Sequence, residues 1–391
     1  MQRSAVARVG VAGAVLLGFA ACGGGSNNPT GMAGGAPSAL YTMTGLVSNG
    51  SAISAQHSDA NLVNPWGLAF NPQGFAWISN QGTSTSTLYD GNGALTPPFT
   101  GGPGSIAIVP GSSGVAQPTG IVFNPTTQFV ISSGAGSAPA LFLYATLGGS
   151  IEGWAQTVSP NSAVIAYDGG ASGNSYTGLT MAQDGSGNHF LYAADFKNGK
   201  VDVFNASFVP TQVGGAFFDA SVPQGYAPYG IQNIPASDGS ARIYVAYAQP
   251  VSTSQHVAMG AGLGYLAVFD AQGTLITHLV SQGALNAPWG LALAPANFGP
   301  LSGALLVGNF GDGTINAYNP TTGASMGALM LTSSQAFTAS GLWALQFGNG
   351  LNGQPSNTLF FTAGPNSETA GLYGRIDVGS RSGSSPSGGM Y

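Results

Sequence analysis

Three side chains with oxygen donors stand at equivalent places in a repeated pattern and could bind a divalent cation. Asn80, Asp195 and Asn309 each end an apolar segment that is typical of a buried strand. Carboxylate and amide oxygens are the ligands that Ca²⁺ and Mg²⁺ prefer. If these strand ends line a central channel, the three donors converge on a metal site. The alternative is that each side chain caps the turn after its own strand, as Asn and Asp commonly do.

Aromatic side chains form a second pattern, which points to ligand binding. Trp66, Tyr229, Trp289 and Trp343 each follow the first residue of one recurring phrase, whereas threonine holds that place in two other copies. If this position faces the mouth of a channel, one half of the rim is aromatic and the other half is open and polar, as a ligand pocket needs. Packing between repeats is the alternative interpretation.

No serine, histidine or acid stands in a recognisable catalytic arrangement. A Ser-His-Asp hydrolase needs a nucleophile on a rigid elbow with a base in reach, and no Gly-x-Ser-x-Gly elbow occurs between a strand and a helix. The four histidines are far apart and none has zincin spacing, so we interpret them as solvated surface residues; they are His57, His189, His256 and His278. Of the four, His57 is the best candidate for a catalytic role, because Asp59 lies two residues further along the chain.

An internal repeat supplies the elements that position these residues. Variants of Pro-Trp-Gly-Leu open an apolar segment roughly every 55 residues. The six copies begin at Pro65, Pro118, Tyr176, Pro228, Pro288 and Leu342. Each interval has room for about four short strands with their turns, which is one propeller blade. The sequence therefore predicts an all-β fold, a six-bladed β-propeller, over residues 39–378.

The last repeat is one strand short. Its third strand ends near Val378, and the Gly- and Ser-rich tail 379–391 is predicted to be disordered. Near the N-terminus, the phrase Gly-Leu-Val-Ser at 45–48 echoes the fourth-strand phrase His-Leu-Val-Ser at 278–281. We therefore expect the N-terminal strand to complete the last blade and close the ring, which removes its open edges.

Composition restricts the classes of fold and partner. Only 5% of residues are charged, and the 63 glycines and 24 prolines favour tight turns over long helices. The 43% of hydrophobic residues provide enough apolar surface for a globular core. The net charge is −6 and the few basic residues are scattered, so a nucleic acid is excluded as a partner.

The N-terminus predicts export. Residues 1–21 place two arginines before a short apolar run, which is typical of a cleaved signal peptide. The run ends in Leu-Gly-Phe-Ala-Ala-Cys, which resembles the lipobox of bacterial lipoproteins and makes Cys22 the predicted lipidation site. Cys22 is the single cysteine, so it cannot form an internal disulfide. Residues 22–38 then form a Gly-, Ser-, Asn- and Pro-rich tether. An ordinary signal peptide is the alternative.

Two segments exceed the repeat and break its pattern. They are residues 124–140 in the second repeat and 248–263 in the fourth. Loops of this kind often carry function. Both are rich in Ser, Gly and Ala, so a plain tolerated insertion is the competing interpretation.

Several longer phrases resemble an uncharacterised family of exported bacterial proteins associated with the PEP-CTERM sorting system. The phrases occupy residues 61–67, 193–201, 225–233 and 306–313, and the resemblance runs from about residue 44 to 378. The chain departs from that family because it lacks a Pro-Glu-Pro sorting tail and has a lipobox-like N-terminus instead. The resemblance implies an envelope protein anchored by lipid, and it brings no known catalytic residues.

Two functions from different classes follow. The first is an exported, lipid-anchored propeller in the bacterial cell envelope that binds a small molecule, a glycan or an envelope protein. It contacts the membrane only through its lipid anchor, and the sequence identifies no cofactor with certainty. Without lipidation it would be periplasmic or extracellular. The second is a Ca- or Mg-dependent lyase or lactonase with its site in the channel, by analogy with other six-bladed propellers. A purely structural surface protein is a third possibility.

Overall fold

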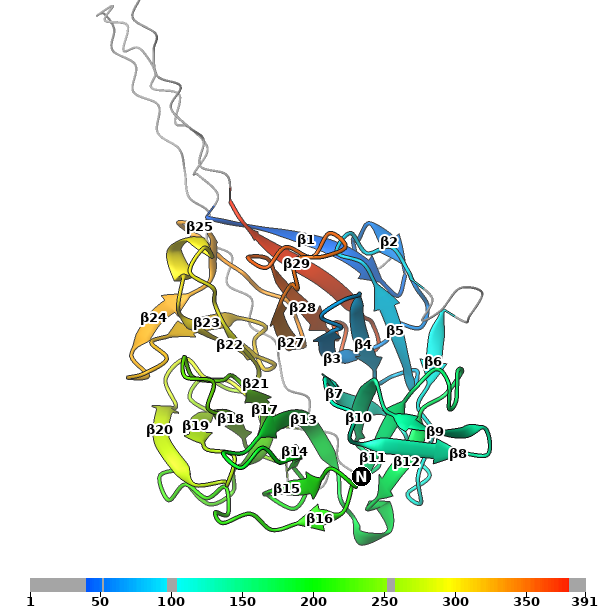
Figure 1. The fold of residues 1–391 in the computed structure, drawn as a ribbon. Helices are drawn as coiled ribbons and strands as arrows, with labels where there is room; N and C mark the ends of the chain where they lie inside the picture. The colour runs from blue at the N-terminus through cyan, green and yellow to red at the C-terminus, as the bar shows by residue number, and fades with distance from the viewer. Residues whose placement is uncertain (1–39, 51–52, 97–103, 252–256, 380–391) are drawn as a thin grey trace, which may run out of the picture. The chain divides into compact units, whose positions relative to one another are not determined.

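The computed structural model describes residues 40–50, 53–96, 104–251 and 257–379. These residues form strands β1 to β29 and two short 3₁₀-helices, η1 (Gly170–Ser172) and η2 (Gly299–Leu301). Six sheets of four or five strands surround a common axis (Figure 1). The predicted all-β, six-bladed propeller is therefore confirmed. Cys22, the signal peptide, the tether and almost all of the tail lie outside the described residues. Within the described part of the chain, no helix has the length and hydropathy to cross a membrane.

The first three blades follow one another along the chain, and their strands run antiparallel from the hub outwards. Blade 1 consists of β3 (Pro65–Phe70), β4 (Ala76–Asn80), β5 (Thr85–Tyr89) and β6 (Ser105–Ala107). Blade 2 consists of β7 (Pro118–Phe123), β10 (Phe142–Thr146), β11 (Ser150–Trp154) and β12 (Val164–Asp168). Blade 3 consists of β13 (Tyr176–Gln183), β14 (His189–Asp195), β15 (Lys200–Asn205) and β16 (Pro210–Thr211).

The other three blades complete the circle. Blade 4 consists of β17 (Ala227–Asn233), β18 (Ile243–Ala248), β19 (Tyr265–Phe269) and β20 (Leu275–Ser281). Blade 5 consists of β21 (Pro288–Leu293), β22 (Leu305–Asn309), β23 (Ile315–Tyr318) and β24 (Ser325–Ala328). Blade 6 begins at the hub with β27 (Leu342–Phe347), β28 (Leu359–Ala363) and β29 (Leu372–Val378).

The outer strands of blade 6 come from the beginning of the described chain. β1 (Tyr41–Ser48) pairs antiparallel with β29, in a register that places Tyr41 opposite Val378. β2 (His57–Ser58) pairs in parallel with β1. Segments from the two ends of the chain therefore lie side by side in one sheet (Figure 1).

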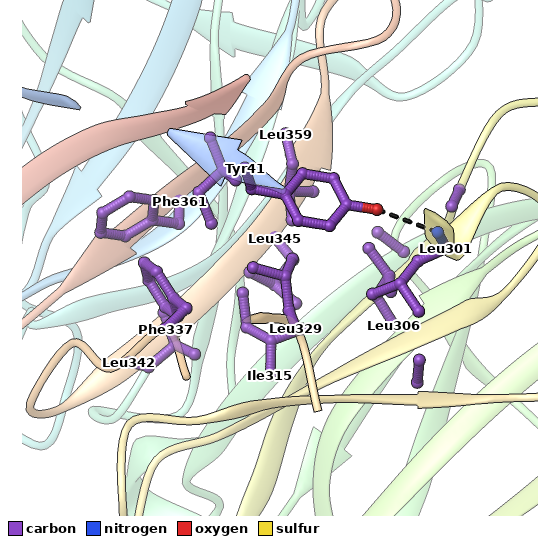
Figure 2. Close-up of a cluster of buried hydrophobic side chains, with 14 of the residues drawn as sticks. Tyr41, Leu301, Leu306, Ile315, Leu329, Phe337, Leu342, Leu345, Leu359 and Phe361 are labelled. Atoms are coloured by element: carbon purple, nitrogen blue, oxygen red, sulfur yellow. Dashed lines mark hydrogen bonds between the residues drawn. The ribbon is translucent and has the colours of Figure 1, made fainter. Parts of the chain in front are cut away.

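Tyr41 connects this N-terminal strand to blade 5. Its hydroxyl donates a hydrogen bond to the carbonyl of Phe298 over 2.7 Å and accepts one from the amide of Leu301 over 2.9 Å. Its ring lies in an apolar cluster with Phe337 and Phe361 (Figure 2). Burial raises the pKa of Tyr41 to about 12. β1 thus contacts blade 5 as well as its own sheet.

The apolar core is divided into clusters between neighbouring blades. The cluster between blades 2 and 3, for example, includes the buried side chains of Leu143, Leu191 and Phe204. A separate cluster at the hub draws on every blade. Its members include Trp66, Leu147, Phe196, Tyr229, Ala287 and Trp343.

Two short hairpins lie outside the six sheets. β8 (Val130–Ser133) and β9 (Gly136–Pro139) form one, and β25 (Met330–Thr332) and β26 (Gln335–Ala336) form the other. The first lies in the 124–140 insertion, where Ile131 is buried in the cluster between blades 2 and 3. A few side chains of that insertion therefore belong to the packed core, whereas most of its residues are exposed.

Candidate functional site

A β-bulge in each innermost strand turns one side chain toward the hub. In β17, Pro228 pairs with Tyr247 and Gly230 with Ala246, so Tyr229 has no partner opposite it. The innermost strands of blades 3 and 5 leave the equivalent residue unpaired in the same way. In blades 1, 2 and 6 the equivalent residue and the one after it stand opposite a single residue of the next strand. A bulge leaves one extra residue outside the ladder and re-aims its side chain. The residue after the first one of each repeat therefore occupies a special position.

Glycine follows this residue in five repeats because the next blade lies against it. A Cβ at Gly230 would lie 2.1 Å from the carbonyl oxygen of Trp289, and one at Gly120 would lie 2.2 Å from the amide of Leu179. Only glycine permits so close an approach of two backbones. In blade 6 the place is held by Ala344. The repeated phrase thus reflects contact between inner strands.

The four aromatic residues predicted to bind a ligand meet at the hub. Trp66 stacks on Trp343 with ring centroids 3.6 Å apart, and Trp289 meets these two rings edge-on at 6.2 and 5.8 Å. Tyr229 lies 6.3 and 6.0 Å from the same pair. Phe310 also stacks on Trp343, at 4.3 Å. We call Trp66, Tyr229, Trp343 and Phe310 the aromatic floor.

The predicted open, polar half of the rim is not observed. Thr119 and Thr177 occupy the equivalent bulge positions of blades 2 and 3, but both are buried. The Thr119 hydroxyl donates to the carbonyl of Tyr176, and the Thr177 hydroxyl donates to that of Tyr229, each over 2.8 Å. These hydroxyls join successive inner strands, because a buried hydroxyl needs a hydrogen-bond partner.

The three indole N–H groups of the cluster differ in their partners. Trp343 Nε1 donates to Asn64 Oδ1 and Trp289 Nε1 to the carbonyl of Thr177, both over 2.9 Å. Trp66 Nε1 is buried and has no hydrogen-bond partner among the described residues. A buried donor left unpaired costs about 1–3 kcal/mol. The floor therefore contains one unsatisfied donor.

A cavity of about 990 Å³ lies against the aromatic floor, which is near the upper end of the range of small-molecule sites. Its polar walls are formed by Gln81, Gln117, Asp312, Thr338, Ser340, Ser367 and Glu368. Val257 and Met259 of the 248–263 insertion also line it. Trp289 does not line this cavity but a small one of about 20 Å³. Three of the four predicted aromatic residues thus face the large cavity.

Glu368 stands on a strained turn in the cavity wall. Asn366, Ser367 and Glu368 have φ angles of 56°, 54° and 67°, in the left-handed region that costs a non-glycine residue roughly 1–2 kcal/mol. Strain of this kind is concentrated at ligand clamps. Glu368 Oε2 accepts a hydrogen bond from Asn64 Nδ2 over 2.7 Å. Asn64 therefore links this carboxylate to the indole of Trp343.

The polar wall of the cavity is acidic. Asp312 and Glu368 contribute carboxylates, and none of the described lining residues is a lysine or an arginine. Asp312 Oδ2 accepts a hydrogen bond from Asn286 Nδ2 over 3.0 Å, and its Oδ1 accepts one from the Thr314 hydroxyl over 2.7 Å. The carboxylates are thus oriented by neighbouring side chains. An anionic ligand would meet repulsion here.

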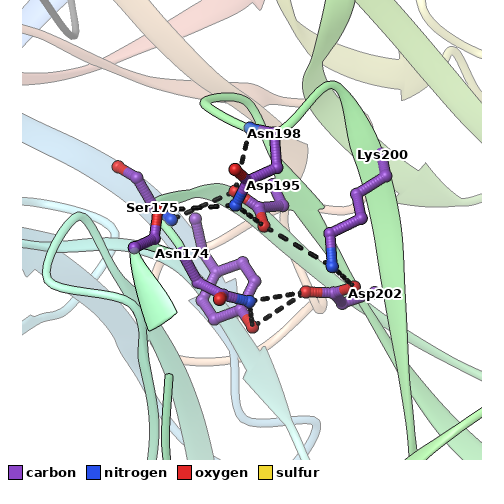
Figure 3. A network of polar contacts seen from close by, with 8 residues as sticks. Asn174, Ser175, Asp195, Asn198, Lys200 and Asp202 are labelled. Carbon is purple, nitrogen blue, oxygen red and sulfur yellow. Dashed lines mark hydrogen bonds and ion pairs between the residues drawn. The ribbon is translucent and has the colours of Figure 1, made fainter. Parts of the chain in front are cut away.

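Asp195, one of the three predicted metal ligands, is held within its own blade (Figure 3). Its carboxylate accepts hydrogen bonds from the amide of Ser175 over 3.1 Å and from Asn198 Nδ2 over 2.7 Å. The ammonium of Lys200 lies 3.9 Å away but is closer to Asp202, at 2.7 Å. Burial raises the pKa of Asp195. The side chain fixes the segment that leads into the innermost strand.

The other two predicted metal ligands also have partners in their own blades. Asn309 Oδ1 accepts a hydrogen bond from the amide of Asn286 over 3.1 Å, and Asn80 Nδ2 donates to the hydroxyls of Thr85 and Thr87. None of the three lines the large cavity. Across the described residues, no group of three or more His, Cys, Asp and Glu side chains could hold a metal ion. The Ca or Mg site therefore stays a prediction, and the observed contacts resemble the turn-capping alternative.

The histidines do not share one environment. His57 is exposed, and the carboxylate of its neighbour Asp59 bonds to Asn61 and Tyr89. His256 lies outside the described residues. For His278 the interpretation as a solvated residue is wrong, because 21% of its side chain is exposed and both ring nitrogens are hydrogen-bonded.

Several cavity residues could not be found from the sequence. Phe310, Glu368 and Asn64 reach the site through contacts between distant parts of the chain. The available signals were indirect: Asn64 directly precedes the first repeated phrase, and Val257 and Met259 lie in an insertion.

The fold and its site define a class: a six-bladed β-propeller whose hub carries an aromatic floor below an acidic cavity. No family model matches the chain. The chain belongs to the family of two uncharacterised proteins of Acanthamoeba polyphaga mimivirus. It is 33% identical to R648 over 341 residues, which cover 85% of the chain and 78% of R648. It is 33% identical to L690 over 291 residues, which cover 72% of each.

These relatives contradict the family predicted from the sequence. The relatives found are viral proteins, and no family model supports membership in the exported bacterial family associated with PEP-CTERM. That prediction is wrong. The phrases on which it rested include inner-strand segments, whose residues are required by the contacts between blades.

Solved structures share the architecture. A protein of unknown function from Bacteroides thetaiotaomicron has a TM-score of 0.50 at 10% identity, over 86% of this chain and 76% of that one. Virginiamycin B lyase from Staphylococcus aureus has a TM-score of 0.47 at 11% identity, over 86% and 99%. Likeness at this level of identity concerns the fold alone, and the second score is too low to support an argument.

Proposed function

We propose that the propeller is a binding module and that its large cavity takes a neutral, polyhydroxylated small molecule, a glycan fragment. One observation carries this proposal: a floor of aromatic side chains lies beneath walls of amides, hydroxyls and carboxylates, with no lysine or arginine among the described lining residues. Apolar surface with a few placed polar groups is typical of small-molecule sites.

The chemistry of the walls matches sugar hydroxyls. Gln81 and Gln117 can each donate and accept hydrogen bonds, and Glu368 can accept several. Phe310, the one partly exposed residue of the aromatic floor, provides apolar contact for the C–H face of a sugar ring. The acidic wall disfavours phosphorylated and other anionic ligands.

A glycan array probed with the full chain tests the proposal. Ser340 lines the cavity, is exposed, and its hydroxyl makes no hydrogen bond to another described residue, so Ser340→Trp should place an indole in the cavity without disturbing the fold. The matched control is Ser207→Trp, which places the same side chain on an exposed site of blade 3. We expect glycans bound by the wild type and the control to lose binding at least tenfold to Ser340→Trp. Absence of any bound glycan, or equal binding by both variants, would refute the proposal.

We further propose that the protein is exported and lipid-anchored in a cell envelope. The support is the apolar run with its preceding arginines and the lipobox-like phrase that ends at Cys22. Metabolic labelling with palmitate in a bacterial host should mark the wild type and not Cys22→Ala. Equal labelling of both proteins would contradict lipidation at Cys22.

We also propose that β1 closes the ring. Its pairing with β29 and the two hydrogen bonds of Tyr41 to blade 5 support this role. Closure matters for binding, because the aromatic floor takes its residues from blades 1, 4, 5 and 6. Removal of β1 should therefore destabilise the cavity as well as blade 6.

The lyase or lactonase alternative makes a different prediction. It requires a bound divalent ion in the channel, which metal analysis of the purified chain would detect. Asp195→Ala should then lose that ion. No contact in the described structure favours this alternative, since Asp195, Asn80 and Asn309 have partners within their own blades.

A further inference from the structure

Ser281, His278 and Asp219 form a hydrogen-bonded series at the outer strand of blade 4. The hydroxyl of Ser281 lies 2.6 Å from His278 Nε2, and His278 Nδ1 lies 2.5 Å from Asp219 Oδ2. This order of a hydroxyl, an imidazole and a carboxylate is the arrangement that activates a serine nucleophile. None of the three residues lines the large cavity. The series is thus a second site, independent of the proposed glycan site.

A β-bulge brings the serine and the histidine together. Residues three apart in a regular strand point to opposite faces of the sheet. In β20, however, His278 pairs with Ala267 and Val280 with Leu266, so Leu279 is an extra residue. Ser281 and His278 then stand opposite Tyr265 and Ala267, which are two residues apart on β19. The bulge therefore returns both side chains to one face.

The carboxylate is positioned from a different segment. Only 1% of the Asp219 side chain is exposed, and its Oδ1 accepts a hydrogen bond from the amide of Ser221 over 2.8 Å. A carboxylate can only accept, so Nδ1 of His278 must carry the proton. Nε2 of the neutral ring then accepts the hydrogen bond of the Ser281 hydroxyl. This is the tautomer that a general base needs.

The surroundings of Ser281 permit access by a substrate. Ser281 is exposed, whereas its base is only partly so. The chain turns sharply after it, with Gln282 and Gly283 at φ angles of 54° and 60°. Among the described residues, none accepts a hydrogen bond from the backbone amide of Gly283. Such an amide can stabilise the oxyanion of an acyl-transfer intermediate.

We propose that Ser281 is the nucleophile of an acyl-transfer reaction on carboxylic esters, with His278 as general base and Asp219 as the positioning residue. The hydroxyl oxygen of Ser281 attacks the ester carbonyl carbon while its proton passes to His278 Nε2. The bond to the alcohol oxygen breaks, and the alcohol leaves with that proton. Water then attacks the acyl-serine carbonyl and gives its proton to His278. The carboxylic acid is released, and the proton returns to Ser281.

A fluorophosphonate probe and p-nitrophenyl acetate test the proposal on the full chain. The probe should label Ser281, as located by peptide mass spectrometry, and p-nitrophenol should be released from the ester. Ser281→Ala should abolish both signals. His278→Gln should slow labelling at least 100-fold, which is the scale of general-base catalysis. The exposed Ser207→Ala serves as the matched control and should change neither signal.

The variants separate catalysis from stability. Ser281 is exposed, so Ser281→Ala should leave the thermal midpoint unchanged while labelling disappears. His278→Gln removes the bond to buried Asp219 and can lower the midpoint, so its labelling is measured well below that temperature. A wild type that reacts no faster than Ser281→Ala, or a label found elsewhere in the chain, would overturn the proposal.

Discussion

Glu152 predicts a pH dependence of stability whose size follows from its burial. The side chain lies on β11 and is fully buried. Its Oε1 accepts a hydrogen bond from the Ser150 hydroxyl over 2.9 Å, and its Oε2 accepts one from the amide of Val109 over 3.2 Å. Burial outweighs these two bonds and raises the pKa of Glu152 from 4.5 to about 7. The folded protein therefore holds this proton more tightly than the unfolded chain.

The sign of the effect follows from linkage. Because the folded pKa is raised, the stabilising contribution is complete below pH 4.5 and is lost as the pH rises to about 7. One pKa unit corresponds to about 1.4 kcal/mol, so the group should lower the free energy of unfolding by roughly 2–3 kcal/mol between pH 5 and pH 8. In Glu152→Gln the amide cannot ionise. Its oxygen can accept from Val109 while its NH₂ donates to Ser150, so the contacts survive.

Urea unfolding of both proteins at pH 5 and pH 8 measures this contribution. The wild type should lose roughly 2–3 kcal/mol more than Glu152→Gln over this range, and the variant should be the more stable protein at pH 8. The comparison of the two proteins removes the contributions of all other titrating groups. Losses that agree within about 0.5 kcal/mol would refute the assignment of a buried, late-titrating carboxyl group.

Three further predictions concern the ring. Gly230→Ala brings a methyl group to 2.1 Å from the carbonyl oxygen of Trp289 and should destabilise the protein by about 1–3 kcal/mol. The control Gly185→Ala, whose methyl group would have nothing within 4 Å, should leave stability unchanged. Similar thermal midpoints for the two variants would contradict the inner-strand contact. Tyr41→Phe leaves two buried backbone groups without their side-chain partner and should cost about 1–3 kcal/mol in urea unfolding; an unchanged value would argue against a role between blades 5 and 6. Deletion of residues 40–50 should abolish cooperative thermal unfolding, and a truncated protein that melts like the full chain would disprove closure by β1.

The fold could be predicted because the same local geometry recurs in every blade and requires the same short phrase each time. Each copy marks a bulge and a close contact with the next blade, so Gly67, Gly120 and Gly230 are required by one geometry. Such requirements leave the same residues at regular intervals along the chain. The aromatic residues that follow the first position of the phrase could be predicted from the sequence for the same reason.

The rest of the site depends on contacts between residues far apart in the sequence and on a strand irregularity, and neither can be recognised in a short segment. Glu368 is bonded to Asn64, which is far away in sequence, and its turn has no repeat equivalent. In a regular strand His278 and Ser281 would point to opposite faces, and only the bulge at Leu279 brings them to one face. The predicted metal ligands stay a prediction, because a strand-end Asn or Asp fits a turn as well as a metal site and each of the three has a partner in its own blade.

Isothermal titration calorimetry with a glycan selected on the array tests the central claim most directly. The account predicts one binding site per chain for the wild type and for Ser207→Trp, with affinity lost at least tenfold in Ser340→Trp. Glu368→Gln should weaken binding as well, because it removes a charged acceptor from the wall. Equal affinity in the wild type and Ser340→Trp would show that the glycan binds elsewhere and would contradict the aromatic-floored cavity as the binding site.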